Sequence, residues 1–75
     1  MLRYAIIIEK STDGGYGAYV PDLHGCVGMG ATHEEVVQNI IDGIKFHLDG
    51  LKQEGMLIPA PSAEAENIVF EYAAA

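Results

Sequence analysis

A single apolar stripe with helical spacing limits the folds that are open to this 75-residue chain. Its members recur at three- and four-residue steps, the pattern of an amphipathic helix with one buried face: Val37, Ile40, Ile41, Ile44, Leu48 and Leu51. Thr32 and Glu35 form a capping box at its start, in which Glu35 can reach back to the Thr32 amide. Gly55 is a natural C-cap. The sequence therefore predicts one long helix that must bury its stripe against another layer.

The remaining segments with regular patterning have the composition and alternation of short β-strands: Leu2–Glu9, Tyr16–Val20, Cys26–Met29 and Asn67–Tyr72. Residues 11–15 join the first two strands and are rich in Asp and Gly, so we expect a hairpin there. Gly28 and Gly30 weaken the third strand and predict a bulge or a close approach of another backbone. Residues 1–72 are expected to form one domain and residues 73–75 a frayed tail.

The predicted order is β-β-β-α-β, an α+β fold. The first three strands form an antiparallel meander, and the helix returns the chain so that the fourth strand runs parallel to the first through a right-handed crossover. The helix covers one face of this sheet, and nothing in the chain covers the other. Burying that apolar face requires a second copy or another partner, so we expect a homo-oligomer, either a dimer or a tetramer.

The charge of the chain is strongly acidic. Four Lys and Arg stand against eleven Asp and Glu, for a net charge of −7. An acidic surface repels phosphate, which argues against direct nucleic-acid binding and favours a basic protein as partner. Net charge also serves solubility alone, and composition does not separate the two. The N-terminal apolar run Tyr4–Ile8 is too short for a signal peptide or a membrane span, so we expect a cytoplasmic protein without membrane contact.

Several motifs in order give this chain its resemblance to a known family. They are Tyr16–Leu23, Gly25–Val27, Gly30–Thr32 with Glu34 and Glu35, Asn39–Ile44, and Glu54–Pro61. Together they resemble the N-terminal pattern of HicB, the antitoxin half of HicA–HicB toxin–antitoxin pairs. The resemblance implies a partly degraded ribonuclease H-like fold. It also implies that the chain binds and blocks a small, basic, RNA-cleaving toxin.

The sequence departs from the family pattern at a few positions. The family often has Pro at the position of His24, an acidic residue at Ala31 and Ala at Gly43. Many HicB proteins also carry a C-terminal DNA-binding domain that represses their own operon. This sequence ends shortly after the predicted fourth strand, so the resemblance does not extend to autorepression by this chain alone.

Enzymatic activity is not expected. Nucleases of the ribonuclease H-like fold need several carboxylates around two metal ions, including one in the middle of the first strand. In the predicted first strand the only acid, Glu9, stands at the end. Asp22, His24 and Cys26 alternate as zinc ligands could, but a turn-capping Asp22 and a small core Cys26 explain them better. No sequence feature places a base beside the Cys26 thiol, so nucleophilic catalysis is disfavoured.

The sequence thus predicts an antitoxin-like binding protein that uses no cofactor and no metal. The alternative is a self-associating orphan module, a scaffold or small-ligand binder without a toxin. The side chains we expect to contact a partner are Tyr19, Asp22, His24, Glu34 and Glu35. Tyr16 and Tyr19 lie on opposite faces of the second strand, and we expect one under the helix and the other on the uncovered face.

Overall fold

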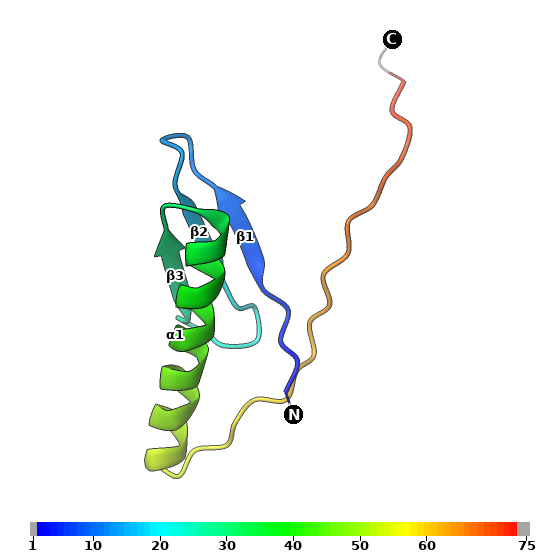
Figure 1. Ribbon diagram of the computed structural model, residues 1–75. Helices are drawn as coiled ribbons and strands as arrows, with labels where there is room; N and C mark the ends of the chain where they lie inside the picture. The colour runs from blue at the N-terminus through cyan, green and yellow to red at the C-terminus, as the bar shows by residue number, and fades with distance from the viewer. Residues whose placement is uncertain (1, 74–75) are drawn as a thin grey trace.

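The computed structural model describes residues 2–73 and has two layers. Strands β1 (Ile7–Lys10), β2 (Tyr16–Tyr19) and β3 (Val27–Gly30) precede helix α1 (His33–Gln53) in the chain. The strands form an antiparallel sheet in the order β1-β2-β3, and α1 lies across one face of it (Figure 1). The predicted α+β class, the three-stranded meander and the single helix are confirmed. Among the described residues, no helix is both long enough and apolar enough to cross a bilayer.

The strand register sorts the side chains into an inner and an outer face. Ile8 is opposite Ala18, which is opposite Gly28, and this row faces the helix. The neighbouring row points away from it: Ile7 is opposite Tyr19, which is opposite Val27. Because successive side chains in a strand alternate, each strand divides its residues between the core and the outside.

The core lies between the sheet and the first half of α1. Its buried residues are Ala18, Val20, Leu23, Cys26, Val36 and Ile40. The partly buried residues packed against them are Tyr4, Ile6, Ile8, Tyr16, Val37, Ile44 and Leu48. Most of the predicted helical stripe is therefore in place, although Val36, which the stripe omitted, is fully buried. Leu23 comes from the loop between β2 and β3 and closes one end of the core.

Two glycines in β3 allow the helix to approach the sheet closely. A Cβ atom on Gly28 would lie 3.3 Å from the backbone nitrogen of Ile40, and one on Gly30 would lie 2.5 Å from that of Val36. Carbon atoms normally pack at about 3.5–4.0 Å, so a side chain at Gly30 does not fit. The close backbone approach predicted for these glycines is confirmed.

The helix ends as its sequence predicts, with one difference in detail. The Thr32 hydroxyl accepts from the Glu35 N–H at 3.1 Å, and the Glu35 carboxylate accepts from the Ala31 N–H, one residue earlier than expected. At the other end Gly55 has φ of 70°. The Gly55 N–H donates to Lys52 and the Met56 N–H to Leu51, which is a Schellman motif.

The prediction of a fourth strand paired with the first needs correction. Residues 54–73 contain no helix or strand, and Asn67–Tyr72 extend away from the sheet as an exposed segment (Figure 1). Strand β1 is also shorter than the predicted Leu2–Glu9, since residues 2–6 have no ladder partner. Alternating Ile68, Phe70 and Tyr72 give the segment strand character, but no strand edge within residues 2–73 is paired with it. Of the predicted frayed tail 73–75, residues 74 and 75 lie outside the described residues.

Candidate protein-binding surfaces

The sheet face that α1 leaves uncovered is an apolar surface built on all three strands. We call it the open face and define it by the outward side chains of the three strands: Ile7, Glu9, Tyr19, Val27 and Met29. Val27 is 68% exposed and Met29 is 77% exposed. Apolar side chains gathered on a fixed sheet, beside one carboxylate, are suited to holding another protein.

Tyr19 occupies the position expected from its sequence. Tyr16 packs against the core under the helix, whereas Tyr19 is 42% exposed in the middle of the open face, between Ile7 and Val27. A tyrosine ring combines a large apolar area with a polar hydroxyl, and such side chains are frequent in interfaces. Tyr19 is thus the one predicted contact residue that lies on the open face.

Asp22 has a different role from the turn cap that its sequence indicated. Its carboxylate accepts the Ala63 N–H at 3.0 Å, the Ser62 N–H at 2.8 Å and the Ser62 hydroxyl at 2.8 Å. The Ala63 N–H, followed by the two Ser62 donors, lowers the pKa of this carboxyl below its usual value. These bonds favour the ionised form. Asp22 therefore anchors the chain that follows the helix to the β2–β3 loop, forty residues away.

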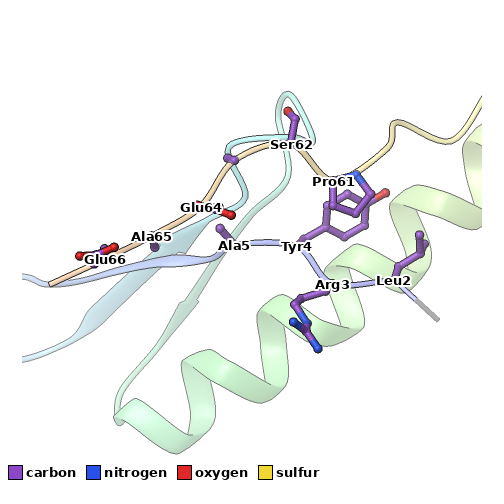
Figure 2. Close-up of a pocket in the computed structure, with 10 residues that line it drawn as sticks. Leu2, Arg3, Tyr4, Ala5, Pro61, Ser62, Glu64, Ala65 and Glu66 are labelled. Carbon is purple, nitrogen blue, oxygen red and sulfur yellow. The ribbon is translucent and has the colours of Figure 1, made fainter.

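A second contact holds the same segment. The Tyr4 hydroxyl donates to the carbonyl oxygen of Pro59 at 2.5 Å. Beyond this point residues 61–66 and residues 2–5 line the two sides of one cleft, and both segments run in the same direction (Figure 2). The chain after α1 is therefore fixed beside the N-terminal segment, yet a cleft separates the two backbones.

The five predicted contact residues do not form one patch. Asp22 and exposed His24 lie in the loop between β2 and β3, at one end of the sheet. Glu34 and Glu35 lie in the first turn of α1, which follows the far end of β3, and Glu35 is engaged in the helix cap. The arrangement separates Tyr19 on the open face from acidic groups at the two ends of the molecule.

The chemistry considered for Asp22, His24 and Cys26 finds no geometric support. No three His, Cys, Asp or Glu residues within 2–73 are grouped as metal ligands would be. Asp22 is bound to Ser62 and Ala63, and Cys26 is a buried core residue whose thiol pKa is raised by burial. Glu9 lies within β1 rather than at its end, and it is the only acid of that strand.

Several exposed apolar residues were not anticipated as contact residues. They are Val27 and Met29 on the open face, where half-buried Ile7 joins them, and Phe46, which is 82% exposed on the outer side of α1. The period-two alternation of the strands, combined with the hairpin register, could have identified the first three. Phe46 lies outside the apolar stripe, and an isolated exposed aromatic residue gives no directional signal from sequence.

Comparison with known proteins supplies the family context. The family model described as "HicB_like antitoxin of bacterial toxin-antitoxin system" matches residues 4–73. A UPF0150 protein of Synechocystis is 41% identical over 57 residues, covering 76% of this chain and 72% of that protein. A UPF0150 protein of Thermoplasma acidophilum is 38% identical over 63 residues, covering 84% and 91%. A chain in the solved structure of a HicA3 and HicB3 toxin–antitoxin complex superposes with a TM-score of 0.68 at 31% identity, covering 81% of this chain and 70% of that chain.

Proposed function

This chain belongs to the HicB-like antitoxin family of bacterial toxin–antitoxin systems, and we propose that it binds a small, basic, RNA-cleaving toxin and neutralises it. The observation that carries the proposal is the similarity, in sequence and in fold, to a chain from a HicA3–HicB3 complex. The partner we infer is therefore a HicA-like toxin. The role is binding rather than catalysis, and it requires no cofactor.

The open face is the surface we assign to the toxin. Its apolar residues supply the area that an interface must remove from water, with Tyr19 and Met29 as the anchoring side chains. Glu9 on the same face and the net charge of −7 favour a basic partner, and opposite charges accelerate the encounter of two proteins. We place His24 and Glu34 at the rim of this interaction, because both are exposed.

The proposal includes two features of the assembly. One is a ribonuclease H-like fold in degraded form, which the three-stranded meander followed by a helix supports. The other is a homo-oligomeric state, which the exposed apolar residues outside the open face support, among them Ile68, Phe70 and Tyr72. Because acidic groups repel phosphate, this chain contributes no direct contact to nucleic acid in the proposed function.

The decisive experiment is co-purification with the product of the adjacent gene, followed by an RNA-cleavage assay with and without this chain. We expect a stable complex and suppressed cleavage. Met29→Lys should weaken both effects, because it replaces an exposed apolar side chain on the open face with a charge that repels a basic partner. Phe46→Lys is the matched control, since it places the same charge on the outer side of α1.

The outcomes separate the alternatives. Loss of inhibition with Met29→Lys but not with Phe46→Lys supports the open face. The opposite result moves the toxin site to the helix and refutes our assignment of the surface. If the adjacent gene encodes a small basic protein that neither binds this chain nor is inhibited by it, the antitoxin function itself is wrong.

A further inference from the structure

The segment Asn67–Tyr72 is exposed along its whole length although half of it is strongly apolar. We call it the C-terminal arm. Ile68 is 65% exposed, Val69 97%, Phe70 76% and Tyr72 74%. Side chains of this kind are normally withdrawn from water, and a contiguous exposed group of them marks a contact surface. Ile68, Phe70 and Tyr72 alternate as they would along one face of a strand.

The arm makes the chain far less compact than its length allows. The radius of gyration is 15.2 Å and the longest extent is 56 Å. A compact domain of this length would have a radius of gyration of about 11 Å. The excess arises because the C-terminal segment runs away from the two-layered body and does not fold back onto it (Figure 1). The arm is thus presented outward as a donor of apolar side chains.

The sheet has an open edge that can accept an added strand. Strand β1 pairs with β2 on one side, and its other edge has no partner strand within residues 2–73. The anchors at Pro59, Ser62 and Ala63 place residues 61–66, which lead into the arm, beside residues 2–5 of the same chain, and both segments run in the same direction (Figure 2).

The charges at the two elements are complementary. Arg3 and Lys10, half of the basic residues in the chain, stand at the two ends of the segment that forms the acceptor edge. Glu66 directly precedes the arm, and Glu71 lies within it. All four side chains are exposed. Opposite charges on the two elements favour their pairing despite the overall negative charge of each copy.

We propose that the C-terminal arm pairs with β1 of a second copy, and that the two copies exchange arms reciprocally to form a two-fold symmetric dimer. Each copy has one arm without a strand partner within residues 2–73 and an open edge on β1, so a symmetric exchange pairs both at once. The predicted fourth strand then exists, but it is supplied between chains. The inference rests on the homo-oligomeric state in the proposed function and names the segments that join the copies, but it does not depend on toxin binding.

The test uses the full chain alone. Sedimentation velocity over about 1–100 μM protein should show a dimer for the unmodified chain. Phe70→Lys should dissociate it, with a dissociation constant roughly 30-fold higher or more, as for loss of a buried interface anchor. Phe46→Lys, which alters another exposed phenylalanine, should leave the dimer intact. Circular dichroism of each variant establishes that the body remains folded.

Amide hydrogen exchange locates the contact and separates exchange between copies from folding within one chain. Amides of residues 67–72 should be protected in the dimer, and this protection should decline as the protein is diluted below the dissociation constant. Protection that is independent of concentration in a monomeric protein would mean that the arm closes onto its own β1, and would overturn the proposal. So would a dimer that Phe70→Lys leaves unchanged, or an arm that becomes protected only after a toxin is added.

Discussion

Replacing Gly30 by Ala tests how closely the helix backbone approaches the sheet. The added Cβ would lie 2.5 Å from the Val36 nitrogen, 2.9 Å from the Val36 Cα and 3.0 Å from the Glu35 carbonyl carbon. All three atoms belong to the helix backbone, so no side chain can rotate away. The first turns of α1 would have to move by roughly 1 Å to restore ordinary carbon contacts of about 3.5–4.0 Å.

The expected cost follows from that displacement. Overpacking a well-filled core typically costs about 1–3 kcal/mol, and contact with a rigid backbone belongs at the upper end of this range. Alanine also restricts the unfolded chain more than glycine does, which raises the free energy of unfolding by roughly 0.5–1 kcal/mol. We therefore expect Gly30→Ala to lower the free energy of unfolding by about 2 kcal/mol. That is a large share of the roughly 4–11 kcal/mol expected for a domain of this length.

Two other glycines provide internal controls. At Gly28 the added Cβ would meet the Ile40 backbone at 3.3 Å, so the loss should be smaller, about 1 kcal/mol or less. At Gly50, within α1, it would meet nothing within 4 Å. Gly50→Ala should therefore raise the free energy of unfolding by about 1 kcal/mol, the ordinary helix preference of alanine over glycine.

Urea unfolding followed by circular dichroism at 222 nm measures all three variants. The protein concentration is held constant, because dimerisation would otherwise add to the apparent stability. The expected order of stability is Gly50→Ala, unmodified chain, Gly28→Ala, Gly30→Ala. If Gly30→Ala unfolds within about 0.5 kcal/mol of the unmodified chain, the reasoning that places the helix backbone directly on β3 is refuted.

The remaining predictions concern the anchor and the buried thiol. Asp22→Asn should weaken hydrogen-exchange protection at the Ser62 and Ala63 amides at neutral pH; unchanged protection would exclude Asp22 as the anchor. Because folding lowers the pKa of Asp22 from its usual 3.8, its stabilising contribution is present above that value and is lost as the pH falls through the lower folded-state pKa. The difference between Asp22→Asn and the unmodified chain should therefore shrink in acid, as measured by urea unfolding from pH 7 to pH 2. Burial raises the pKa of the Cys26 thiol, so iodoacetamide should label it far more slowly in the native protein than in urea, as followed by mass spectrometry; equal rates would place the thiol at the surface.

Local patterns in the sequence were sufficient for most of the body. The three strands, their turn, the Thr32 cap and the Gly55 terminus depend on residues within a few positions of one another, and each was identified, although β1 begins at Ile7 rather than at Leu2. The prediction for the two tyrosines of β2 also held, because alternation along a strand assigns opposite faces to Tyr16 and Tyr19. These features are encoded locally, and local chemistry determines them.

The contacts that were missed join distant parts of the chain. The alternation of Ile68, Phe70 and Tyr72 gives the arm its strand character, but it does not say which edge the arm pairs with. Asp22 gave no sign of its bonds to Ser62 and Ala63, since a short acidic side chain after proline is equally suited to a turn. Of the five side chains expected to contact a partner, only Tyr19 lies on the open face, because exposed residues such as Met29 become a surface only once the strand register is known.

Alternate residues of strand β3 are under two separate structural requirements. Its inward positions, Gly28 and Gly30, carry no side chains and are fixed by the approach of α1, whereas its outward positions, Val27 and Met29, touch little of the body. Substitutions at the outward pair can therefore accumulate without threatening the fold. A lineage of such proteins could follow a changing partner by altering those two residues while the glycines beneath them stay the same.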